Sequence, residues 1–179
     1  MIFDTHDSMT IGEVFKKARE AYGDNTLLSS IQKQSGLFSK SYTYAEAYKL
    51  SQNYSNLLYK SGYGHGHRIA LLIGNVIEYF IYKIAFSNIG ASCVPINPDY
   101  LPKEISYVLL HSEVELIITT LEYLEKVDKA LISIDKKPNL VVLNSYFQID
   151  KNLPKAINVI PINKPLNSKS ESSILYTSG

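Results

Sequence analysis

The last residues of the chain are those whose types and order best suit a chemical role. A short apolar run, Ile174–Tyr176, leads directly into Thr177, Ser178 and Gly179. Small hydroxyl residues and a glycine after a strand suit a phosphate cradle, because the backbone can approach closely while amide and hydroxyl donors face the oxygens. Strands also commonly end in such residues without binding anything. The alternative interpretation is therefore an ordinary turn.

Four other residues carry side chains with possible chemistry. His65 and His67 lie one residue apart between glycines, but no third ligand follows nearby, so we interpret this stretch as a solvated turn rather than a metal site. Cys93 has apolar neighbours and is expected to be a buried strand residue rather than a nucleophile. His111 stands at an expected helix end, where we expect it to cap the helix or face water.

The stretch Arg68–Pro98 predicts the structural unit that organises the chain. Ile69–Ile73 and Ser92–Ile96 are apolar runs of strand length. Between them, Val76–Ile89 has helical spacing and is apolar almost all round, and Gly90 follows as the expected stop. Strand, helix and strand in about thirty residues predict a βαβ unit with parallel strands, a right-handed crossover and a largely buried helix.

Further elements are expected on both sides of this unit. Before it, the sequence predicts a helix that begins with the capping box Thr10–Glu13, a hairpin of strands Thr26–Ile31 and Phe38–Tyr42, and a long helix that begins with the capping box Thr43–Glu46. After it, we expect helix Lys103–His111, strand Val114–Thr119, helix Leu121–Ile132, and strands Leu140–Leu143, Ile157–Ile160 and Ile174–Tyr176. The alternation predicts an α/β fold, an open, mostly parallel sheet with helices on both faces, which binds ligands beyond the carboxyl ends of its strands.

Two common nucleotide sites are not supported by motifs. A dinucleotide site needs Gly-x-Gly-x-x-Gly between a strand and a helix, but only Gly74 follows Ile69–Ile73. A Walker-type loop is also absent from the sequence. The sequence therefore argues against an NAD-dependent enzyme and against a P-loop enzyme.

Composition excludes several further classes. The formal net charge is +1, which argues against a nucleic-acid-binding surface. The single cysteine cannot form an internal disulfide, which indicates a reducing compartment. The first residues lack the pattern of a secretion signal, and no apolar run has the length needed to cross a bilayer. We expect a cytoplasmic protein that has no transmembrane segment and binds no nucleic acid.

Three stretches resemble core motifs of the adenylate-forming, or AMP-binding, enzyme superfamily. This superfamily includes acyl-CoA synthetases, luciferases and the adenylation domains of peptide synthetases. Tyr42–Glu46 resembles the first motif, and Ile89–Pro98 resembles the second. Tyr176–Gly179 resembles the opening of the third motif, Tyr-Thr-Ser-Gly, which carries the phosphate-binding loop.

Two further matches lie between these motifs. Gly66–Ile69 resembles the family's Gly-Asp-Arg-Val, with His67 in place of the aspartate. Asn75 and Glu78 match the Asn-x-x-Glu that opens the next helix in acyl-CoA synthetases. This second match favours an acyl-CoA synthetase over an amino-acid adenylation domain, which stays as an alternative.

The resemblance implies a function and a place in a longer enzyme. In this family a carboxylate attacks the α-phosphate of Mg·ATP, and a thiol, usually coenzyme A, then displaces AMP from the acyl-adenylate. Thr177, Ser178 and Gly179 would begin the loop that binds the ATP phosphates, and no catalytic or metal-binding residue is expected within the chain. Residues 1–179 would form the N-terminal portion of an adenylation domain, cut inside this loop, and are expected to be inactive alone. The acid, whether a fatty, carnitine-like, aromatic or amino acid, stays open. A non-catalytic α/β binding module is the alternative from another class.

Overall fold

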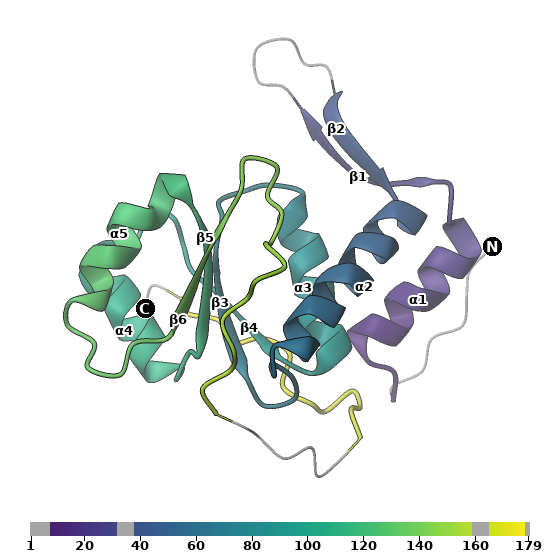
Figure 1. The fold of residues 1–179 in the computed structure, drawn as a ribbon. Coiled ribbons are helices and arrows are strands. Elements are labelled where there is room, and N and C mark those ends of the chain that lie inside the picture. Colours follow the sequence, from purple (N-terminus) through teal and green to yellow (C-terminus); the bar gives the residue numbers. More distant parts are fainter. Residues whose placement is uncertain (1–7, 32–37, 159–164, 178–179) are drawn as a thin grey trace.

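Five helices and six strands alternate in the described part of the computed structural model, residues 8–31, 38–158 and 165–177 (Figure 1). The helices are α1 (Ile11–Tyr22), α2 (Tyr44–Lys60), α3 (Glu78–Ile89), α4 (Pro102–His111) and α5 (Leu121–Leu131). The strands are β1 (Thr26–Ile31), β2 (Phe38–Thr43), β3 (Arg68–Leu72), β4 (Ser92–Pro95), β5 (Leu116–Thr120) and β6 (Asn139–Leu143).

Short-range signals fix the helix ends as the sequence predicts. At the start of α1, the Glu13 amide donates to the Thr10 hydroxyl at 3.2 Å, and the Thr10 amide donates to the Glu13 carboxylate at 2.7 Å. The same reciprocal pair, Thr43 with Glu46, begins α2. Helix α3 ends at Gly90, whose φ of 72° lies in the left-handed region where glycine alone has no steric cost.

The main sheet is parallel and has the order β4-β3-β5-β6. Its central strand β3 pairs with β4 on one side and with β5 on the other, so that Ile69 lies between Cys93 and Leu116. Strands β1 and β2 form a separate antiparallel hairpin that projects away from the main sheet (Figure 1). The predicted βαβ unit and the predicted hairpin are both confirmed.

Helices cover both faces of the sheet, as expected for an open α/β fold (Figure 1). Helices α2 and α3 pack on one face, with α1 against them, and their core includes Leu58, Tyr82 and Phe86. Helices α4 and α5 pack on the other face, where Ile105 and Val127 are fully buried. The two apolar layers explain why the central strands consist of buried residues on both faces.

The prediction of a strand at Ile174–Tyr176 is wrong. The chain there pairs with the free edge of β4 at one point only, where Cys93 donates to the Ser172 carbonyl and accepts from the Ile174 amide, both at 3.0 Å. The next donor on this edge of a parallel ladder would be the N–H of Pro95. Proline has no N–H, so the ladder ends after one residue pair.

The expected strand Ile157–Ile160 and the expected absence of a transmembrane segment can be compared with the described residues alone. Residues 159 and 160 of the expected strand Ile157–Ile160 lie outside the described residues. Among the residues that the structure describes, no helix has both the length and the apolar character needed to cross a membrane.

Candidate functional site

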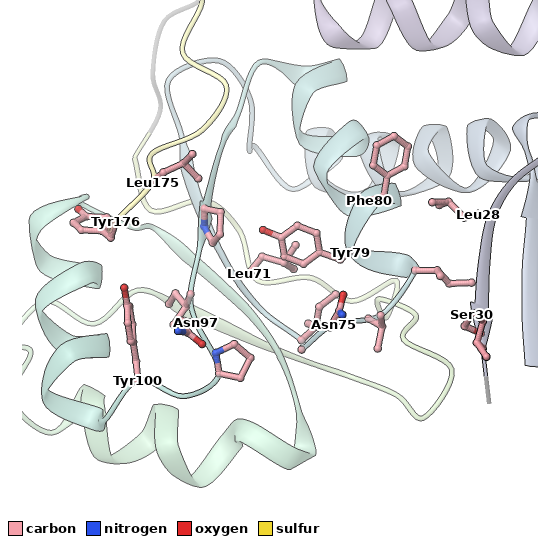
Figure 2. A pocket seen from close by; sticks show the side chains of 18 of the residues that line it. Leu28, Ser30, Leu71, Asn75, Tyr79, Phe80, Asn97, Tyr100, Leu175 and Tyr176 are labelled. Atoms are coloured by element: carbon pink, nitrogen blue, oxygen red, sulfur yellow. The ribbon is translucent and has the colours of Figure 1, made fainter. Parts of the chain in front are cut away.

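A cavity of about 850 Å³ lies beyond the carboxyl ends of β3 and β4 (Figure 2). This is where an open parallel sheet is expected to bind its ligands. Four parts of the chain form its walls, namely β1, the end of β3 with the β3–α3 connection and the first turn of α3, the connection that follows β4, and residues 175–176. The lining residues are Leu28–Ile31, Leu71, Ile73–Ile77, Tyr79, Phe80, Pro95–Pro98, Tyr100, Leu175 and Tyr176.

The lining of this cavity is apolar and aromatic with a few neutral polar groups. The amides of Asn75 and Asn97 and the hydroxyl of Tyr79 are among its polar groups (Figure 2). Burial, together with the adjacent Cys93, raises the pKa of Tyr79, so its hydroxyl remains a neutral hydrogen-bonding group at physiological pH. No acidic or basic side chain occurs among the described lining residues. The cavity therefore suits an uncharged or aromatic portion of a ligand.

An ion pair beside the cavity joins the β1–β2 hairpin to the start of α3. Glu78, in the first turn of α3, is 3% exposed and pairs with Lys40 of β2. The hydroxyl of Tyr42 donates to the same carboxylate at 3.1 Å. Partial burial acts to lower the pKa of Lys40, but its hydrogen bonds to Glu78 and Tyr42 raise the pKa overall. This cluster links the hairpin, whose strand β1 lines the cavity, to α3.

The segment of residues 171–177 connects the amino end of the sheet to the cavity. At its start, Arg68 Nε donates to Glu171 Oε1 at 3.1 Å. In its middle, the segment pairs in parallel with Cys93, so it runs toward the carboxyl end of β4. Near its end, the Tyr176 hydroxyl lies 2.8 Å from His111 Nδ1, and Tyr176 also lines the cavity. Thr177 follows directly and is exposed.

Of the three predicted loop residues, Thr177 alone lies within the described part of the chain, and it is not among the residues that line the cavity. Thr177 is described and adjoins the cavity-lining Tyr176. Ser178 and Gly179 lie outside the described residues. Their expected role in phosphate binding stays a prediction.

The expectation of a solvated turn at His65 and His67 is wrong for His67, which is 2% exposed. Its Nδ1 lies 3.1 Å from the Gly64 amide, and its Nε2 lies 3.0 Å from the Asn158 carbonyl. The ring is buried because the backbone of two loops supplies its hydrogen bonds. In the described part of the chain, no three His, Cys, Asp or Glu side chains are grouped as a metal ion would require.

The expectation for Cys93 is confirmed, and His111 faces water as expected. Cys93 is fully buried in β4, and burial raises the pKa of its thiol to about 11. His111 is exposed at the end of α4.

Sequence reasoning did not find the clusters around Glu78 and Tyr176. Both join residues far apart in the chain, such as Lys40 with Glu78 and His111 with Tyr176. The one local signal was the spacing of Tyr107 and His111, four residues apart on α4, which places both rings on the same side of that helix.

In the comparison with known protein families, this chain matches one family model. The model of the family described as AMP-binding enzyme matches residues 15–179. A crotonobetaine/carnitine–CoA ligase of Citrobacter koseri is 27% identical over 189 residues, which cover 98% of this chain and 35% of that protein. The corresponding ligase of Salmonella paratyphi A is 25% identical, covering 97% of this chain and 32% of that protein. The chain thus spans about a third of the length of the curated relatives that it matches.

Solved structures agree on the fold. The anthranilate CoA ligase AuaEII in complex with anthranoyl-AMP matches with a TM-score of 0.75 and 17% identity, covering 98% of this chain and 33% of that one. The N-terminal domain of FACL13 from Mycobacterium tuberculosis matches with a TM-score of 0.72 and 20% identity, covering 95% of this chain and 42% of that domain. Because the sequence identity is this low, these matches establish the fold alone.

Proposed function

The chain belongs to the family of AMP-binding enzymes, and from this premise we propose that residues 1–179 form the N-terminal portion of the adenylation domain of an AMP-forming acid–CoA ligase. In the first half-reaction, a carboxylate oxygen attacks the α-phosphorus of ATP and pyrophosphate leaves. In the second, the thiol of coenzyme A attacks the acyl carbon of the adenylate, AMP leaves and a thioester forms. The thiol proton is lost to solvent or to a base.

The path of the 171–177 segment is the observation that carries this proposal. The segment pairs in parallel with Cys93 of β4 and reaches the cavity at Leu175 and Tyr176, directly before Thr177 in the sequence. Thr177, Ser178 and Gly179 begin the loop that receives the β- and γ-phosphates. Hydroxyl and amide donors there stabilise the negative charge that develops on the departing pyrophosphate.

ATP, Mg and coenzyme A are the proposed co-substrates. The described residues offer no group of three metal-ligating side chains, so we assign no step to the metal on these residues. The uncharged lining of the cavity supports binding of the apolar part of an acid, as in a fatty, carnitine-like or aromatic acid. A cytoplasmic location is part of the same proposal.

Pyrophosphate exchange tests the function. The protein is expressed from its complete gene and incubated with ATP, labelled pyrophosphate and one acid at a time, from fatty, carnitine-like, aromatic and amino acids. We expect exchange that depends on one class of acid, followed by a thioester when coenzyme A is added. Absence of exchange with every acid would reject the proposal.

The alternative of an amino-acid adenylation domain is decided by the same panel. Asn75 and Glu78 support the acyl-CoA ligase, because this pair matches the pattern of acyl-CoA synthetases. Exchange with amino acids alone, and no thioester with coenzyme A, would favour the adenylation domain of a peptide synthetase.

A further inference from the structure

Tyr176 is held from one side by two aromatic residues of α4. Its ring makes an edge-to-face contact with His111, with centroids 5.7 Å apart and planes at 81°. It makes a second such contact with Tyr107, at 6.2 Å and 81°. Tyr107 and His111 in turn stack on each other at 5.4 Å, so the three rings form one cluster. Edge-to-face contacts stabilise aromatic pairs beyond the area that they bury.

The cluster also contains a directed polar contact. The Tyr176 hydroxyl lies 2.8 Å from Nδ1 of His111, a normal hydrogen-bond distance. A ring that is fixed both by its faces and by its hydroxyl has little freedom to rotate. Tyr176 also lines the cavity.

Backbone pairing cannot supply the same restraint at this point of the chain. The ladder with β4 ends at Ile174, because the next donor on that edge would be Pro95. Leu175 is 69% exposed, and Thr177 is exposed as well. Among the described residues 175–177, Tyr176 is the one whose side chain packs against the core next to α4.

We propose that His111 and Tyr107 are positioning residues, which fix Tyr176 and so place Thr177 for the nucleotide phosphates. This inference rests on the proposed function, in which Thr177 begins the phosphate loop. Neither residue touches the substrate. Their loss loosens the entrance of the loop and weakens ATP binding, while the chemical step at saturating ATP keeps its rate.

The test uses alanine and conservative variants of the protein expressed from its complete gene. His111→Ala and Tyr107→Ala remove the contacts. His111→Gln keeps a hydrogen-bonding group, and Tyr107→Phe keeps the ring. Leu110→Ala is the matched control, because Leu110 is also exposed on α4 but lines a different cavity.

Two readouts separate positioning from general stability. We expect the alanine variants to speed amide hydrogen exchange at residues 176 and 177 and to raise KM for ATP, each by about three- to tenfold. The kcat of pyrophosphate exchange should stay within about twofold, and the conservative variants should restore most of the affinity. An unchanged KM for ATP in both alanine variants would overturn the inference.

Failure of the proposed function can be distinguished from failure of this inference. If the wild-type protein shows no pyrophosphate exchange with any acid, the proposed function is rejected and the ATP part of this inference falls with it. Amide exchange then still decides whether α4 holds Tyr176. If amide hydrogen exchange at residues 176 and 177 is the same in the alanine variants as in wild type, the contacts of Tyr107 and His111 with Tyr176 do not restrain this stretch.

Discussion

Lys40 and Glu78, which are 38 positions apart in the sequence, form an ion pair that joins the β1–β2 hairpin to the first turn of α3. The side chain of Glu78 is buried, whereas that of Lys40 is partly exposed. Strand β1 of the hairpin and the first turn of α3 both line the cavity, and Leu28 and Ser30 lie on the same side of it as Phe80 (Figure 2). This pair therefore joins two neighbouring parts of the cavity wall.

Removing the charge of Lys40 is expected to destabilise the protein. Lys40→Met leaves the Glu78 carboxylate buried with the Tyr42 hydroxyl as its remaining partner, and we expect a loss of about 2 kcal/mol. Urea denaturation measures this change. Lys49→Met, on the exposed side of α2, is the matched control and should change stability little. The double variant Lys40→Met, Glu78→Leu should recover part of the loss, and equal stability of Lys40→Met and wild type would contradict the role of the pair.

A methyl group at Gly90 is expected to destabilise the protein strongly. The left-handed φ of 72° disfavours any side chain, and a Cβ would lie 2.4 Å from Leu166 Cδ2 and 3.2 Å from the His65 backbone. We expect Gly90→Ala to cost about 3 kcal/mol in thermal or urea denaturation. Gly64→Ala is the control, because a Cβ there meets the Ile89 carbonyl at an ordinary 3.6 Å. Similar losses for both variants would show that the helix end does not need glycine.

Low pH should weaken the interaction of Glu171 with Arg68, which holds the start of the 171–177 segment. Partial burial acts to raise the pKa of Glu171, but hydrogen bonds with Ser92 and Arg68 and the charge of Arg68 lower it overall, below the ordinary value of 4.5. A lowered folded-state pKa stabilises the fold above the ordinary pKa, and this stability is lost as pH falls through the lowered value.

The variant Glu171→Gln tests this dependence. Because Glu171 is half exposed, we expect the variant to lose less than about 1 kcal/mol at pH 7. Denaturation at several pH values should show the difference in stability between the two proteins shrinking as the pH falls below the ordinary pKa of 4.5 and through the lowered value. A difference that stays constant from pH 7 to pH 3 would contradict an ion pair at this position.

Cys93 should resist thiol reagents until the protein unfolds. Burial raises the pKa of its thiol from the ordinary 9.0 to about 11, so at pH 8 the thiolate fraction falls about a hundredfold. We expect modification by a thiol reagent to be at least that much slower in the native protein than in urea. The sequence has a single cysteine, so the assay reports this position alone. Fast modification of the native protein would mean that β4 is open to solvent.

Much of the fold follows from local patterns. The two capping boxes, the glycine stop at Gly90 and the strand lengths around α3 are properties of short stretches, which the chain realises independently of its distant parts. The parallel pairing of β3 and β4 follows as well, because a crossover helix between two buried strands allows little else. The family resemblance rests on the same local motifs.

What the sequence could not reveal depends on long-range partners. Glu78 interrupts an apolar helix, and only the fold shows that Lys40 and Tyr42 meet it there. His67 is buried because the backbone near Asn158 completes its hydrogen bonds. The missing strand at Ile174–Tyr176 has a cause visible in the sequence, Pro95, but its effect depends on which edge of β4 the segment approaches.

The side chain of Thr177 offers the most direct test of the claim that this chain begins a phosphate loop. Pyrophosphate exchange by the protein expressed from its complete gene is measured for wild type, Thr177→Ser and Thr177→Val. Thr177 is exposed, so both substitutions should leave the fold intact. Loss of one hydroxyl donor to the leaving phosphates should lower kcat/KM for ATP about ten- to a hundredfold in Thr177→Val, while Thr177→Ser stays near wild type. A Thr177→Val protein that exchanges pyrophosphate as fast as wild type would contradict the account.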